Sequence, residues 1–136
     1  MMFNPRFPHT LVVTRMKKDS HGEPVIDEEG MPVYGIVTLD VVVMRDGVPQ
    51  RRGDGSFVTE KADSIPFGYR TSGKSTNDTS AVEVTDQMLA TPMFITHLDP
   101  SDILELTDYD RTYHCEVVRK TTFNLGSNIW VKEVKG

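Results

Sequence analysis

The chain has 136 residues, the size of one ordinary domain and too short for a two-domain enzyme. Hydrophobic residues make up 38 % and charged residues 26 %, which is typical of globular proteins in water and argues against collagenous, disordered and membrane classes. The net charge of −5 has the wrong sign for a protein that coats nucleic acid, although a local basic loop can still contact phosphate.

Three features bear on the compartment. The first ten residues lack the apolar segment behind a basic start that marks a secretory signal. The longest wholly apolar run, residues 41–44, is far shorter than the roughly 20 residues that cross a bilayer. The single cysteine, Cys115, cannot form an internal disulfide and has no cysteine neighbours for a zinc cluster. We therefore expect a cytoplasmic protein with no membrane contact.

Two segments in the first half of the chain predict β-strands, because β-branched residues dominate them. They are residues 10–16 and residues 34–44. The odd-numbered positions from 33 to 43 form an apolar face, whereas Thr38 and Asp40 are expected to point to solvent. This period of two residues indicates a strand with one buried face.

The last third of the chain predicts a meander of short antiparallel strands separated by turn-forming residues. On these strands Trp130, Tyr113, Cys115 and Val117 are expected to fill the interior of a barrel. The four predicted strands cover residues 93–98, 103–106, 111–122 and 128–134.

Helix is a minor component of the prediction. Only residues 85–91 predict a helical turn, with Thr85 as its N-cap and Pro92 ending it. The sequence thus predicts an all-β fold, a single small antiparallel β-barrel over residues 1–136 with long loops and at most one short helix.

Three connections exceed the 4–6 residues that are usual in compact domains, and long connections are generally functional or disordered in isolation. We expect them to become ordered only against neighbouring subunits, where an interface offsets the entropy cost. They are residues 17–33, rich in Asp, Glu, Gly and Pro; residues 45–56, with three arginines; and residues 68–80, rich in Gly, Ser, Thr and Asn.

The loop of residues 45–56 is a candidate contact surface. It carries Arg45, Arg51 and Arg52 beside Asp54, and arginines recognise carboxylates and phosphates. Two interpretations stay open, a solvated surface loop and a contact surface for an acidic partner or nucleic acid.

Residues 68–75 satisfy the phosphate-binding pattern G-x-x-x-x-G-K-[ST]. A true site of this kind follows a buried strand and opens a helix whose N-terminal amides hold the anion. Here Pro66 interrupts the upstream segment, and the residues downstream are poor helix formers. We therefore expect a chance match that binds no nucleotide, and retain Arg70 and Lys74 as candidate contact residues of this loop.

No other motif predicts catalysis. Residues 52–54 read Arg-Gly-Asp and are interpreted as a tight turn, and residues 101–102 and 108–110 as turn formers that bond their own backbone. The four histidines have no partner at a metal-ligand spacing. We expect a protein that is not an enzyme and needs no metal or other cofactor.

Residues 98–106 read Leu-Asp-Pro-Ser-Asp-Ile-Leu-Glu-Leu, and two further predicted strands follow at residues 111–118 and 128–134. This order resembles the layout of tailed-phage head-closure proteins: strand, x-Gly-Asp, strand, short turn, Tyr-x-Val and closing strand. Ser101 stands where that family usually has Gly, before Asp102. Residues 7–15, the polar loop and the long strand after it also resemble small head-tail connector proteins of phages and prophages of gut bacteria.

The resemblance implies a structural virion protein at the head-tail junction. Such proteins form a homo-oligomeric ring below the portal and adaptor, close the channel that holds the packaged DNA and present a surface to the tail. It implies that the loops of residues 45–56 and 68–80 are candidates to face the channel. Phe3 and Phe7 would belong to an N-terminal arm, residues 1–9, that reaches a neighbour, and the protein would pass from the host cytoplasm into the virion.

Two other functions remain open. A small β-barrel module that binds a ligand or an oligonucleotide predicts an aromatic groove. A P-loop nucleotide binder predicts a parallel sheet with helices, which this helix-poor sequence does not favour.

Overall fold

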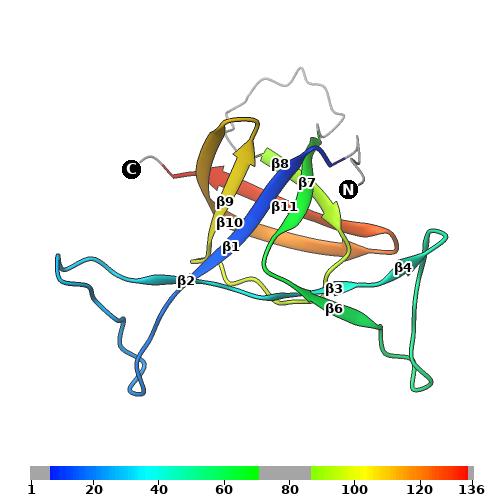
Figure 1. Cartoon of the computed structure of the whole chain (residues 1–136), viewed down its shortest axis with the longest axis horizontal. Helices are drawn as coiled ribbons and strands as arrows, with labels where there is room; N and C mark the ends of the chain where they lie inside the picture. Colours follow the sequence, from blue (N-terminus) through cyan, green and yellow to red (C-terminus); the bar gives the residue numbers. More distant parts are fainter. Residues whose placement is uncertain (1–6, 71–86, 135–136) are drawn as a thin grey trace.

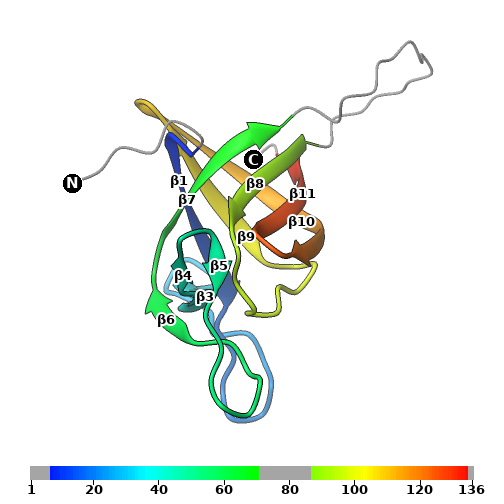
Figure 2. The same ribbon diagram turned by 90° about the vertical axis from the view of Figure 1, so that its right-hand side faces the viewer.

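The computed structural model describes residues 7–70 and 87–134. Six antiparallel strands close into a barrel in the order β1-β7-β8-β11-β10-β9, with β9 pairing back to β1 (Figures 1 and 2). The described ranges contain no helix, so the predicted small all-β barrel is confirmed. Its strands are β1 (His9–Met16), β7 (Ile65–Arg70), β8 (Gln87–Pro92), β9 (Ile103–Asp108), β10 (Arg111–Phe123) and β11 (Gly126–Glu133).

Five shorter strands lie at one end of the barrel, at the bottom of Figure 1. β2 pairs with the last residues of β1 and prolongs the barrel wall, whereas β3 pairs with β6 and β4 with β5. These strands are β2 (Tyr34–Ile36), β3 (Leu39–Val42), β4 (Met44–Arg45), β5 (Val48–Pro49) and β6 (Thr59–Ala62).

The strand predicted over residues 34–44 is divided into β2, β3 and β4. Its first part stays on β1, where the Val37 amide donates to the Val13 carbonyl over 2.8 Å. Its second part leaves the barrel wall and pairs with β6, and the Val42 amide donates to the Met93 carbonyl over 2.8 Å. The apolar alternation therefore predicts extended backbone correctly, but a change of pairing partner ends each strand.

The predicted helical turn over residues 85–91 is wrong, because residues 87–92 form strand β8 between β7 and β11. Leu89 and Thr91 point into the barrel with the period of a strand, and pairing on both sides overrides the weak local preference. The proposed cap, Thr85, lies outside the described residues. Residues 93–98 are extended but contribute one isolated bridge, between Phe94 and Val41, instead of the predicted strand.

The barrel interior is apolar and close to the predicted one, with one exception. Cys115 and Val117 are buried in it and Tyr113 packs against it, as expected. Trp130 instead faces outward, and the guanidinium of Arg119 lies 4.0 Å from the centre of its ring. Because successive residues of a strand alternate between faces, the buried Ile129 and Val131 place Trp130 on the outside.

The connection of residues 17–33, named here the acidic arm, is closed by its own backbone hydrogen bonds. The Lys17 amide donates to the Val33 carbonyl, the Val33 amide to Val25 and the Val25 amide to Lys17, over 2.8 to 2.9 Å. The connection of residues 45–56 is named here the basic arm. Three backbone hydrogen bonds of 2.9 Å close its base, from the Val43 amide to the Val58 carbonyl, from Val58 to Gln50 and from Gln50 to Val43.

Three five-residue turns with one hydrogen-bond pattern build the arms. The amide of the first residue donates to the carbonyl of the fifth, and the glycine in fourth place donates to the carbonyl of the first. Each glycine has a positive φ, between 80° and 92°, which suits a residue without a Cβ. The turns cover residues 19–23, 27–31 and 52–56, so the tight turn expected at 52–54 is confirmed.

The expectation that the long connections lack order of their own is therefore wrong for two of them. Residues 17–33 and 45–56 are held by hydrogen bonds within each arm, because Asx-type contacts and glycine turns satisfy their backbone locally. In the third, residues 68–70 belong to strand β7 and residues 71–80 lie outside the described residues.

Candidate functional site

The two arms project from the same end of the barrel in opposite directions along the longest axis of the molecule. Figure 1 shows the acidic arm at the lower left and the basic arm at the lower right. In Figure 2, viewed along that axis, the two arms overlap at the bottom of the molecule. The two arms leave the barrel end on opposite sides, so the molecule has two separate projecting surfaces.

The arms carry opposite charge. The acidic arm has two lysines against five carboxylates, which leaves a net charge of −3. The basic arm has three arginines against two aspartates, which leaves a net charge of +1. The charged side chains of both arms are exposed, so their fields reach solvent and any partner that docks there.

The predicted contact residues of the loop 45–56 all lie on the basic arm. Arg51 lies over the ring of Phe57 at 4.2 Å and donates to the Gly55 carbonyl over 3.0 Å. Asp54 accepts hydrogen bonds from the Ser56 hydroxyl and amide, which lower the pKa of this carboxyl below its ordinary value. Arg45 lies in β4 and Arg52 opens the turn of residues 52–56, and both are exposed.

Two of the other predicted contact residues, Arg70 and Phe7, are described by the structure and are not part of this surface. Arg70 ends strand β7 and pairs with Met88, and β7 runs away from the arms toward the opposite end of the barrel (Figure 1). Phe7 is half-buried just before β1. Lys74 and Phe3 lie outside the described residues. The basic loop 45–56 and the segment 68–80 therefore do not form one surface where the structure describes them.

Exposed apolar side chains accompany the charges on the acidic arm. Ile26 and Met31 are 51 % and 58 % exposed, and Val25 is 36 % exposed. On the basic arm Val48 is 56 % exposed. Apolar side chains on a projecting segment have no core of their own to enter, and groups of exposed apolar side chains occur at contact surfaces.

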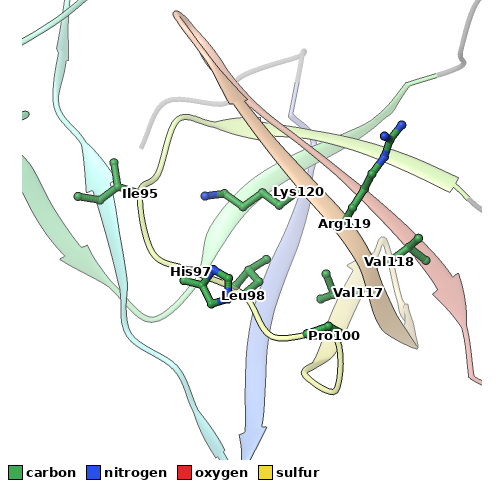
Figure 3. Close-up of a pocket in the computed structure, with 8 residues that line it drawn as sticks. All are labelled: Ile95, His97, Leu98, Pro100, Val117, Val118, Arg119 and Lys120. Carbon is green, nitrogen blue, oxygen red and sulfur yellow. The ribbon is translucent and has the colours of Figure 1, made fainter.

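A pocket of about 340 Å³ lies between β10 and the segment of residues 95–100 (Figure 3). Lys120 crosses it and donates to the carbonyls of Phe94 and Thr96 over 2.8 and 3.2 Å. Desolvation lowers the pKa of Lys120 to about 8. Arg119 points away from the pocket, and His97 lies 3.5 Å from Asp99. Lys120 and Arg119 are thus already engaged, by two carbonyls and by the Trp130 ring, which favours a structural role over ligand binding.

An aromatic cluster lies around the start of β1 and the β9-β10 hairpin. His9 packs against Phe67, Tyr69 and Tyr109 with ring centres 5.2 to 5.6 Å apart, and its Nδ1 lies 3.1 Å from Asp108. Tyr109 has φ 62° at the tip of the β9-β10 hairpin and is 86 % exposed.

The ion pair of Arg15 and Asp102 was not predicted. Asp102 is fully buried and accepts two hydrogen bonds of 2.8 Å from Arg15, although it also accepts the Asp99 amide of its own turn, as expected for a turn former. This pair joins β1 to the residue that directly precedes β9, at the end of the barrel where the acidic arm begins.

The described residues contain no group of three or more His, Cys, Asp or Glu side chains placed to hold a metal ion. Within the same ranges no helix is long and apolar enough to cross a membrane. Comparisons of the chain with protein-family models, curated proteins and solved structures returned no match.

Proposed function

We propose that this protein is a structural component of the head-tail junction of a tailed phage or prophage. In this role it forms a ring below the portal and adaptor, closes the channel of the packaged DNA and offers a docking surface to the tail. It performs no chemical reaction, and its partners are copies of itself together with the portal or adaptor and tail proteins.

The observation that carries the proposal is the pair of arms on one end of a closed barrel. The six strands close into a barrel through the pairing of β9 with β1, which leaves little sheet edge for strand addition and supports a role of the projecting arms in assembly. The arms supply projecting surfaces with charge and exposed apolar side chains on opposite sides of the molecule. A subunit of a ring needs two such different surfaces, because each copy contacts two neighbours.

Deletion of the coding sequence from the phage or prophage that carries it tests the proposal. We expect DNA-filled heads that lose their DNA and fail to join tails, and expression of the chain in trans should restore complete particles. Complete, infectious particles from the deletion strain would contradict the proposed function.

One observation favours a second function, a β-barrel module that binds nucleic acid. Tyr109 and Tyr69 present partly exposed rings beside His9, and exposed aromatic rings can stack on bases. Fluorescence anisotropy with a labelled oligothymidylate tests this alternative. Saturable binding that Tyr109→Ala weakens would support it, and the absence of binding at low salt would exclude it.

A further inference from the structure

We infer that the acidic arm of one copy of this protein binds the basic arm of a second copy. The acidic arm is residues 17–33 and the basic arm residues 45–56. The pairing rests on the charge, the exposed side chains and the placement of the two arms. Closure of such pairs into a ring rests on the proposed function, whereas the pairing itself does not.

The charges of the arms are complementary and available. Glu28 and Glu29 are exposed at the tip of the acidic arm, and neither carboxylate has a lysine or arginine partner in the described part of the chain. On the other arm Arg45 and Arg52 are exposed, and the charge of Arg52 also helps to lower the pKa of Asp54 in its own turn. Opposite potentials on two surfaces favour their encounter and fix their relative orientation.

Apolar side chains give the contact a component that salt does not screen. Val25, Ile26 and Met31 stand exposed among the carboxylates of the acidic arm, and Val48 stands beside Arg45 on the basic arm. Burial of these groups against each other removes apolar surface from water, which stabilises the contact. The charges then select the partner, and the apolar groups add affinity.

Both arms are already shaped before they meet. Each is closed by three backbone hydrogen bonds at its base and contains the same glycine turn. A segment that is ordered in advance loses less conformational entropy on binding than a flexible loop does. The arms can therefore form a specific contact although each is short.

The placement of the arms determines the kind of assembly. They lie at opposite ends of the longest axis of the molecule, so one copy cannot pair its own arms (Figure 1). A contact between two different surfaces is heterologous and leaves one free arm of each kind on a pair of copies. Further copies can add at these free arms until a ring closes or a chain forms.

Charge-reversal variants of the full-length protein test the pairing by sedimentation velocity at low salt. The first variant, Glu28→Lys with Glu29→Lys, makes the acidic arm basic and leaves the turn-forming Asp27 in place. The second, Arg45→Glu with Arg52→Glu, makes the basic arm acidic and leaves the Arg51 contacts intact. The matched control, Glu116→Lys with Glu133→Lys, makes the charge change of the first variant on exposed positions of the barrel wall.

We expect the wild-type protein to associate in a concentration-dependent manner that added salt weakens. Each arm variant alone should associate at least tenfold more weakly, because like charges then face each other. An equimolar mixture of the two variants should associate again, since each arm meets an arm of opposite charge, and the control should behave as the wild type.

Three results would overturn the inference. They are a wild-type protein that stays monomeric at millimolar concentration, arm variants that associate as the wild type does, and a mixture that stays as weak as its components. Failure of the proposed function would give a different result. The deletion strain would then make complete particles, while the arms would still pair in solution.

Discussion

Arg15 on β1 holds the buried carboxylate of Asp102 through two parallel hydrogen bonds of 2.8 Å, from Nε to Oδ1 and from Nη2 to Oδ2. Arg15 also donates to the His97 carbonyl over 3.1 Å, and the hydrogen bond to Asp102 is the main reason that its pKa is raised. The bidentate geometry fixes the entry of β9 against β1, and thereby one seam at which the barrel closes.

Removal of either partner should destabilise the fold. We expect Arg15→Ala to lower the free energy of unfolding by about 3 kcal/mol, because it leaves the buried Asp102 carboxylate without its partner. Asp102→Ala should cost less, because the half-exposed Arg15 can then be solvated by water. Urea unfolding measures this loss. In the double variant the two losses should not add, and full additivity would show that the two side chains do not interact.

Lys120 should make stability depend on alkaline pH. Desolvation lowers its folded pKa from 10.5 to about 8, so between these values the unfolded chain binds a proton that the folded chain does not. The free energy of unfolding of the wild type, relative to that of Lys120→Met, should therefore rise from about pH 8 to about pH 10.5. Urea unfolding at pH 7.5 and pH 10 measures the difference, with the exposed Lys132→Met as control. A difference that is constant or falls with pH would contradict this account.

The glycine turns should respond to substitution according to their backbone angles. Gly55 has φ 92°, so Gly55→Ala should destabilise the turn of residues 52–56 by about 1–2 kcal/mol. Hydrogen exchange of the Arg52 amide, which donates to Ser56 over 2.7 Å, should then accelerate about 5- to 30-fold while the barrel amides are unchanged. Gly53→Ala is the matched control, since open space surrounds Gly53 and its φ is not positive. Equal exchange rates in both variants would refute the assigned turn.

Gly126 is needed for strand pairing rather than for its backbone angle. A Cβ at this position would lie 2.6 Å from the Thr91 carbonyl oxygen, where β11 pairs with β8. Gly126→Ala should cost about 1–3 kcal/mol, because the two strands must separate to admit the methyl group. Thermal unfolding should show a Tm several degrees lower, whereas the exposed neighbour variant Leu125→Ala should stay close to the wild type. An unchanged Tm for Gly126→Ala would contradict the tight packing.

Much of the barrel could be predicted because the local sequence of most of its strands is typical of β-structure. β-branched residues and the turns between them predict β1, β9, β10 and β11 with small errors at their ends. β8 could not be predicted, since its local residues favour a helical turn and only pairing with β7 and β11 makes it a strand. Trp130 was misplaced because strand alternation, not residue size, decides which side chains enter the barrel.

The candidate site was half predicted. The arginines of residues 45–56 are visible in the sequence as a charged loop, whereas residues 17–33 are predicted only as a long connection. A usable signal was present, because residues 19–25 and 27–33 both read Asp-x-x-Gly-x-Pro-Val and so repeat one turn eight residues apart. The Arg15-Asp102 pair joins residues 87 positions apart, and no local pattern predicts such a contact.

The proposed role at a phage head-tail junction is tested most directly by electron microscopy of the neck of virions produced from the genome that carries the coding sequence. We predict copies of the six-stranded barrel in a ring below the portal, with the acidic arm of each copy against the basic arm of the next. A complete neck that contains no copy of this chain would contradict the assignment.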